Sequence, residues 1–127
     1  MKSLRSISWF GLVGACAALV HYISAVLIEA NHWLTPAYAN LLAFLIAFPV
    51  SYFGHRSLSF AGNVRSHLHA LPRFLTVAIT GFAANQWLLL SLLQHTQLPF
   101  WLALGLVMVL VAVATFLSSK YWAFRHG

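Results

Sequence analysis

Long stretches without a charged side chain limit how this chain can fold more than any other feature. The first stretch runs from Ser6 to Ile28, and a helix needs about 20 mainly apolar residues to cross a bilayer. Of the 127 residues, 61% are hydrophobic and 6% are charged, whereas about 25% are charged in soluble domains. A soluble fold of this composition would lack the polar residues to cover its surface, so we predict an integral membrane protein.

Four apolar stretches predict four transmembrane helices in a single all-α domain that spans residues 1–127. The first stretch continues past Cys16, so we interpret the N-terminus as a full span rather than a cleaved signal peptide or lipoprotein leader. Short turns are expected at residues 29–35 and 94–98, and a longer polar connection at 54–72. The predicted spans are Ser6–Ile28, Pro36–Phe53, Phe74–Leu93 and Pro99–Ser119.

Two segments of the chain share one plan and predict an internal repeat. Each begins with a proline, continues through an uncharged apolar stretch and ends in a phenylalanine, over Pro36–Phe60 and Pro99–Phe124. A basic residue precedes the last phenylalanine by four positions in both segments. We therefore predict two repeated helical hairpins, at about residues 5–60 and 73–125.

Lysine and arginine are unevenly distributed along the chain, and their distribution predicts the topology. All seven lie outside the predicted spans, and neither short turn contains one. Because Lys and Arg concentrate in cytoplasmic connections, we predict that both termini and the middle connection are cytoplasmic. The seven residues are Lys2 and Arg5 before the first span, Arg56, Arg65 and Arg73 in or beside the middle connection, and Lys120 and Arg125 after the last span.

Three polar residues are expected in the outer half of the membrane. His21 lies about 22 Å from the inner end of the first span, and Asn40 about 6 Å from the outer end of the second. Glu29 follows the first span on the same side, so these three side chains can form one cluster. His21 also falls on or beside a stripe of small residues from Gly11 to Ala25, which predicts that it faces protein. Two interpretations stay open, a translocation path for a polar group and hydrogen-bonded packing between the first two spans.

Asn85 and Gln86 are polar residues within the third span. They lie about 17 Å from its start, near the centre of the bilayer. Neighbouring residues on a helix face directions about 100° apart, so we expect at most one of the two to point into a translocation path. Path and packing stay open for these residues as well.

Basic residues at equivalent helix ends suggest a site for a lipid phosphate. Arg56 and Lys120 end the second and fourth spans, while Arg5 and Arg73 stand at the same face on the other two. Cations that converge on one cytoplasmic rim would attract an anionic headgroup. The alternative is anchoring, in which the basic side chains only reach for the membrane surface.

The residues needed for several other functions are missing from the sequence. Glu29 is the only carboxylate, so paired-carboxylate catalysis within one chain is excluded, and we predict no enzymatic activity and no cofactor. His67 and His69 have no further ligands nearby in sequence, so no metal site is predicted. The cations are spread over three segments rather than gathered on one face, so nucleic acid is not an expected partner.

Several short segments match one family in their order and spacing. They are Phe10-Gly11-Leu12-Val13-Gly14, Leu19-Val20-His21-Tyr22, Ala39-Asn40 with Leu42-Ala43-Phe44, Ser51-Tyr52-Phe53-Gly54-His55-Arg56 leading to Phe60, and Lys120-Tyr121-Trp122-Ala123-Phe124. Together they resemble the GtrA-like family of small four-span bacterial membrane proteins, and the likeness covers nearly the whole chain.

The resemblance implies a role in cell-surface polysaccharide or O-antigen synthesis. Proteins of this kind are thought to move polyprenyl-phosphate-linked sugars across the bacterial cytoplasmic membrane, beside the glycosyltransferase that makes them. The expected partners are therefore the lipid-linked sugar, membrane lipids and a membrane glycosyltransferase. A homo-oligomer is also expected, because four spans leave little room for a sugar to cross. Two alternatives are a non-transporting partner of the glycosyltransferase and a small proton-coupled exporter.

Overall fold

The computed structural model describes residues 2–54 and 67–118, with the side chains of residue 8 and of residues 11–54 and 75–114. These residues form helices and no strand, which confirms the all-α membrane fold. Within these ranges, three helices are long and apolar enough to cross a membrane, and the fourth has a shorter apolar stretch over Phe100–Ala114. The four helices are α1 (Lys2–Ala30), α2 (Pro36–Gly54), α3 (His67–His95) and α4 (Phe100–Ser118).

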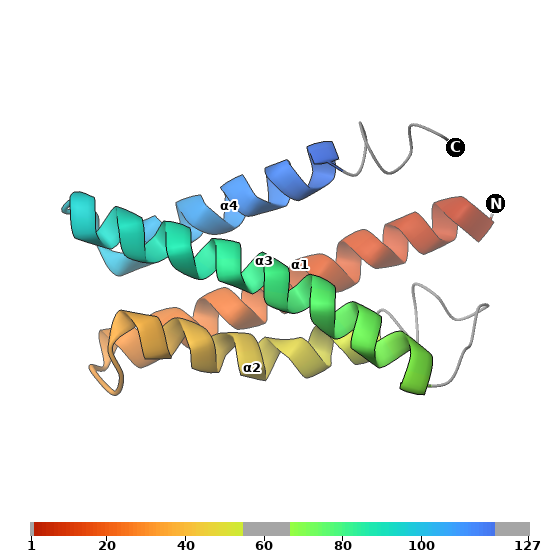
Figure 1. Cartoon of the computed structure of the whole chain (residues 1–127), viewed down its shortest axis with the longest axis horizontal. Helices are drawn as coiled ribbons and strands as arrows, with labels where there is room; N and C mark the ends of the chain where they lie inside the picture. Colours follow the sequence, from red (N-terminus) through yellow and green to blue (C-terminus); the bar gives the residue numbers. More distant parts are fainter. Residues whose placement is uncertain (1, 55–66, 119–127) are drawn as a thin grey trace.

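The helices form two antiparallel hairpins that pack side by side (Figure 1). Helix α1 packs along α2, α3 packs along α4, and contacts of α2 with α3 and of α1 with α4 join the two hairpins. We call the end that holds residues 31–35 and 96–99 the turn end, and the opposite end, where α1 begins and α4 stops, the terminal end (Figure 1). The repeat relation between the hairpins stays a prediction.

A tight turn after α1 places α2 directly against it. His32 has a positive φ of 57°, a left-handed conformation that allows a helix to stop abruptly. The backbone N–H of His32 donates to the Glu29 carbonyl over 3.0 Å, and that of Trp33 donates to the Ile28 carbonyl over 3.1 Å. Carbonyls at the end of α1 are thereby paired, and the chain reverses within five residues into Pro36, the first residue of α2.

Two helices extend beyond the predicted spans. Helix α3 begins at His67 rather than Phe74, and α1 begins at Lys2 rather than Ser6. The predicted boundaries followed the limits of the apolar stretches. A helix can continue past the hydrocarbon because its backbone hydrogen bonds are internal and need no apolar surroundings. The connection between α2 and α3 is correspondingly shorter than the predicted segment 54–72.

Small residues allow the helices to approach closely at the core. Ala25 of α1 and Ala43 of α2 are completely buried, together with Leu89 of α3 and Leu104 of α4. The Tyr22 hydroxyl also donates to the backbone carbonyl of Trp101 over 2.8 Å, which ties α1 to α4 near the turn end. Because a membrane gives no hydrophobic force between helices, this close packing and the hydrogen bonds between helices hold the bundle together.

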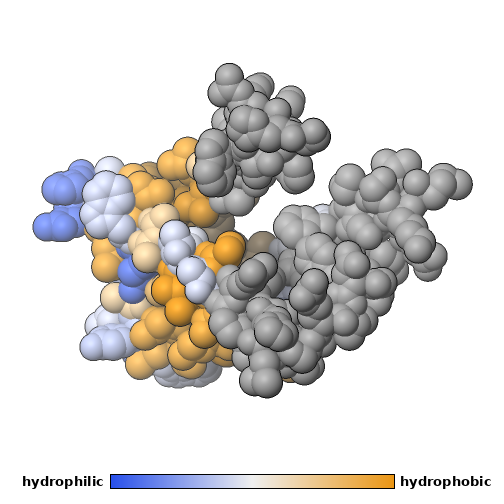
Figure 2. Space-filling model, turned by 45° about the vertical axis from the view of Figure 1, so that its right-hand side comes forward, coloured by the Kyte–Doolittle hydropathy of each residue, from blue (hydrophilic) through white to orange (hydrophobic). Residues whose placement is uncertain are grey.

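The outer surface of the bundle is mainly apolar. Large hydrophobic side chains point outward from every helix, for example Leu19 of α1, Leu45 of α2, Val77 of α3 and Val109 of α4. Figure 2 shows apolar residues over most of the described part of one face, with hydrophilic residues gathered toward the left edge of the view. A surface of this kind suits contact with lipid chains rather than water.

Candidate functional site: a polar cluster between three helices

Asn40 lies at the centre of a polar cluster that joins three helices. Its side chain is completely buried, one turn after the start of α2. Asn40 Oδ1 lies 2.7 Å from His21 Nε2 on α1. Asn40 Nδ2 lies 2.8 Å from Asn85 Oδ1 and 2.8 Å from Gln86 Oε1, both on α3. We call these four residues the Asn40 cluster.

The chemistry of the groups fixes the direction of each hydrogen bond. An amide oxygen only accepts, so His21 Nε2 carries the hydrogen that it donates to Asn40 Oδ1. The two hydrogens on Asn40 Nδ2 are donated to the oxygens of Asn85 and Gln86. Gln86 Nε2 in turn donates to the backbone carbonyl of Ala37 over 3.1 Å. A chain of donors therefore runs from α1 through α2 to α3 and back to α2.

The cluster is largely buried within the bundle. His21, Asn40 and Asn85 are buried, and Gln86 is half-buried. Among the described side chains, no buried polar atom lacks a hydrogen-bond partner. His21 faces protein, as the stripe of small residues predicted. That stripe is only partly covered, however, because Ala25 is buried whereas Gly11 is exposed.

Glu29 does not join the cluster that the sequence led us to expect. It is half-buried in the last turn of α1, eight residues beyond His21, which separates the two by about 12 Å along the helix. Among the described residues, no hydrogen bond connects its carboxylate to His21 or Asn40. The reason is that Asn40 lies level with His21, which is more than two helical turns before the end of α1.

Asn85 and Gln86 both contact Asn40, although they are adjacent on α3. The two N–H bonds of the Asn40 amide point in different directions, and each reaches one of the two oxygens. Depths estimated from the helix ends placed these residues nearer the bilayer centre than Asn40. Their direct contact shows that α2 and α3 bring the three side chains to one level. His21, Asn40, Asn85 and Gln86 are therefore together, and of the five predicted path residues only Glu29 is apart.

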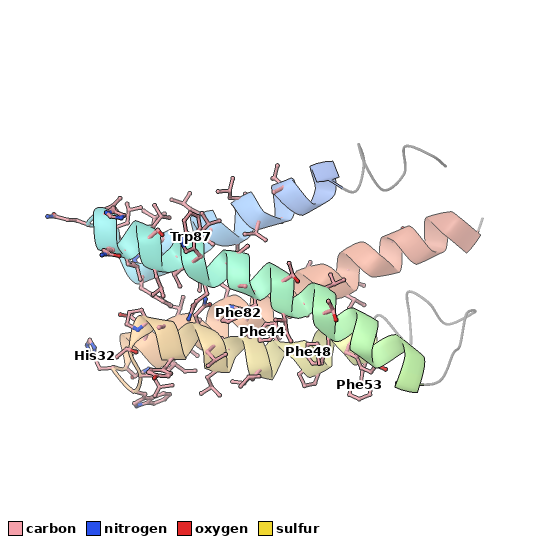
Figure 3. All side chains as sticks on the ribbon, viewed as in Figure 1. His32, Phe44, Phe48, Phe53, Phe82 and Trp87 are labelled. Atoms are coloured by element: carbon pink, nitrogen blue, oxygen red, sulfur yellow. The ribbon has the colours of Figure 1, made fainter. Side chains whose placement is uncertain are left out.

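A series of aromatic rings follows the cluster along α2 and α3. Phe44 lies one turn beyond Asn40, and Phe82 lies one turn before Gln86, so the two rings meet on the side of the cluster that faces the terminal end. Their centroids are 4.6 Å apart with an interplanar angle of 25°. Phe48 and then Tyr52 continue the series along α2, with centroid distances of 6.1 and 6.2 Å. Figure 3 shows Phe82 above Phe44, with Phe48 next toward the terminal end.

These aromatic residues were not predicted as a group from the sequence. The signal was present, because Asn40, Phe44, Phe48 and Tyr52 follow one another at four-residue steps and therefore share one face of α2. Only the contact with α3 shows that Phe82 completes the series.

The predicted phosphate site lies largely outside the described residues. Arg56 and Lys120 are not described. Arg5 belongs to α1 and Arg73 to α3, but their side chains are not among those described. The grouping of these four cations therefore stays a prediction.

The Asn40 cluster is suited to hydrogen bonding rather than to covalent chemistry. It contains an imidazole and three amides, which offer donors and acceptors to a polar ligand, and it contains no carboxylate or thiol. Within the described residues, no group of three or more His, Cys, Asp or Glu side chains could hold a metal ion.

Comparison with known proteins supports the membrane role. A family model described as the transmembrane domain of GtrA/DPMS proteins matches residues 9–124. No curated protein and no solved structure gives a significant match. The matched range includes the Asn40 cluster and nearly all of the four helices. The chain therefore belongs to the GtrA/DPMS transmembrane-domain family, whose members are generally non-catalytic membrane proteins associated with the flipping of lipid-linked sugars.

Proposed function

We propose that this protein translocates a polyprenyl-phosphate-linked sugar across the bacterial cytoplasmic membrane for the synthesis of cell-surface polysaccharide or O-antigen. The observation that carries the proposal is the Asn40 cluster, four polar side chains from three apolar helices that meet inside the membrane-spanning part of the bundle. Polar residues in such a position are costly to place in a membrane and mark substrate pathways. Membership of a family associated with the flipping of lipid-linked sugars supports a lipid-linked sugar as the substrate of this pathway.

The three parts of the lipid-linked sugar make different demands on the protein. A sugar has many hydroxyl groups, which lose their hydrogen bonds to water unless polar side chains replace them. The Asn40 cluster supplies such groups between α1, α2 and α3. The polyprenyl tail can stay in lipid, beside the apolar outer surface. The phosphate would be bound by cations at the loading face, and Arg56, Lys120, Arg5 and Arg73 are the residues proposed for it.

One observation favours a second function, that of a non-transporting partner that anchors or assembles a glycosyltransferase. Every buried polar atom among the described side chains has a hydrogen-bond partner, and a fully bonded network can serve packing alone. A proton-coupled exporter gains no support from Glu29, because this carboxylate lies in the last turn of α1 and outside the Asn40 cluster.

Reconstitution distinguishes transport from anchoring. The purified protein is placed in liposomes that contain a polyprenyl-phosphate hexose. It should move this lipid from the inner to the outer leaflet, where a membrane-impermeant reagent added outside can react with the sugar. Transport by the protein alone supports the proposal. If the lipid-linked sugar does not move between the leaflets with this protein alone, but does so when the glycosyltransferase is added, the protein acts as an assembly partner.

Assembly into a homo-oligomer, or with the glycosyltransferase, is part of the proposal. The middle of the bundle is filled by its own side chains, including the completely buried Leu89, Leu104 and Asn40. A sugar must cross about 30 Å of hydrocarbon, and a filled four-helix bundle provides little space for it. An active purified species with the mass of one chain would contradict this part.

Topology is a separate prediction from the distribution of charge. The protein should have both termini and the connection between α2 and α3 in the cytoplasm, so that the turn end faces outward. Reporter fusions after Arg65 and after His95 should give cytoplasmic and external signals respectively. The opposite pattern would reverse the orientation and remove the proposed loading face.

Substitution of the cations tests the proposed phosphate site. Arg56→Gln and Lys120→Gln should each leave membrane insertion and abundance near normal but weaken transport. Arg56→Gln should have the larger effect, because a guanidinium can bind phosphate through two parallel hydrogen bonds. Arg65→Gln, in the middle of the connection, is the control and should be nearly silent. Surface sugar modification at matched abundance measures the effect, and equal mild losses from all three would indicate membrane anchoring instead.

A further inference from the structure

A pair of stacked rings lies directly beside the hydrogen-bonding groups of the Asn40 cluster. Phe44 and Phe82 come from the two helices that also carry Asn40 and Gln86, and each is one turn from its polar neighbour. Because α2 and α3 run in opposite directions, both rings fall on the same side of the cluster. The seam between α2 and α3 thus has a layer of amides followed by a layer of aromatic rings. Figure 3 shows the ring pair Phe44 and Phe82.

These two layers supply the two interactions that a sugar ring makes with proteins. Amide and imidazole groups hydrogen-bond to hydroxyls, which point outward from the edge of the ring. The faces of a sugar ring carry C–H groups with slight positive charge, and these pack on the negative face of an aromatic ring. Apolar packing alone needs no such pairing, since six of the seven buried residues of the hydrophobic core cluster are Ala, Leu or Val.

We propose that Phe44 and Phe82 form the stacking subsite for the sugar ring of the transported lipid, with the Asn40 cluster binding its hydroxyls. This inference rests on the proposed function and names the residues that recognise the sugar. In this structure the two rings stack on each other at a centroid distance of 4.6 Å. A sugar that enters the seam separates them and packs its C–H face on one of the rings.

The rest of the aromatic series extends the subsite toward the terminal end. Phe48 and Tyr52 follow Phe44 at one-turn steps, and the rings of Phe48 and Tyr52 are nearly parallel, with an interplanar angle of 5°. Each step is about 6 Å along the helix, so successive ring faces lead from the end of α2 to the amides. A sugar that moves along the seam would exchange one ring face for the next.

The experiment measures how strongly the protein prefers a lipid that carries a sugar. The probes are a polyprenyl-phosphate hexose and the methyl ester of the same polyprenyl phosphate, a phosphodiester of the same charge that lacks the sugar. The readout is the ratio of their Kd values for purified full-length protein in nanodiscs. Contributions of the tail and the phosphate cancel in this ratio. Phe44→Leu and Phe82→Leu should each reduce the preference by about threefold to tenfold, the size of an aromatic stacking contribution.

Two further variants separate stacking from packing. Phe82→Tyr keeps the ring face and should retain the preference within about twofold. Phe53→Leu is the matched control, because Phe53 is exposed and contacts Tyr52 edge-on rather than joining the stacked pair. Either leucine variant at the ring pair decides the result by itself if the other fails to fold.

The possible results separate this inference from the function on which it rests. If the wild type shows no preference for the sugar-bearing lipid, the proposed function fails and the subsite fails with it. If the wild type has the preference and both leucine variants keep it, or lose affinity for the two lipids equally, the stacking subsite is wrong while the proposed function stands. A selective loss of sugar preference in the leucine variants supports the subsite.

Discussion

Asn40→Leu is expected to lower the free energy of unfolding by about 2–4 kcal/mol and to abolish transport of the lipid-linked sugar. Asn40 makes three side-chain hydrogen bonds to residues of two other helices, and each interhelical bond in a membrane protein contributes about 0.6 kcal/mol. The substitution also leaves His21 without its acceptor, and Asn85 and Gln86 without their donor. Each buried group that finds no new partner adds about 1–3 kcal/mol to the loss.

A matched asparagine at the surface provides the control for stability. Asn31 is exposed in the turn that follows α1, and its Nδ2 donates to the Leu27 carbonyl in the last turn of α1, over 2.7 Å. Asn31→Leu should therefore change the free energy of unfolding by less than about 1 kcal/mol. Unfolding in a denaturing detergent measures both variants. An effect of Asn40→Leu no larger than that of Asn31→Leu would show that the cluster contributes no stability.

The loss of transport has to be separated from the loss of stability. Transport is therefore compared in liposomes at equal amounts of folded protein. His21→Leu should also impair transport, but less than Asn40→Leu, because His21 makes one bond in the cluster and Asn40 makes three. The double substitution should lower the free energy of unfolding by less than the sum of the two single losses, since the two residues share a hydrogen bond. If both single variants fold and transport at the wild-type rate, the cluster serves packing alone.

Gly54→Ala is expected to lower the free energy of unfolding by about 1–3 kcal/mol through a clash between α1 and α2. A Cβ atom on Gly54 would lie 2.6 Å from Val13 Cγ1 and 3.3 Å from Val13 Cγ2. Val13 cannot easily turn away, because a β-branched side chain has one strongly preferred rotamer in a helix. The helices must therefore move apart at the end of α2, and unfolding in a denaturing detergent measures the cost.

Removal of the opposing side chain identifies the cause of that cost. In a Val13→Ala background, Gly54→Ala should have little further effect, because its new methyl group no longer meets Val13 Cγ1. Gly14→Ala is the control, since a Cβ at Gly14 would meet no atom within 4 Å. It should be neutral or stabilise the helix by about 0.5–1 kcal/mol, because alanine loses less backbone entropy than glycine. A large loss from Gly14→Ala would instead indicate a partner against that face of α1.

The sequence alone determined the helices and the residues worth attention in them. Stretches without charge located the spans, because a bilayer excludes charged side chains, and α2 begins at Pro36 as predicted. The period of the α-helix placed His21 toward protein, and the structure confirms its burial. Helix ends were less accurate, as α3 shows, because apolar composition marks the hydrocarbon layer rather than the limits of a helix.

The tertiary structure decided which of these residues meet. Sequence gives the position of a residue along its own helix, but the stagger and tilt of one helix against another depend on packing between them. Helix α3 has 29 residues and is about 43 Å long, longer than the hydrocarbon is thick, so its ends do not determine the depth of Asn85 and Gln86. Close packing of α2 on α3 brings both amides to Asn40 and Phe82 to Phe44. Packing of α1 on α2 leaves Glu29 apart, because Asn40 lies level with His21 rather than with the end of α1.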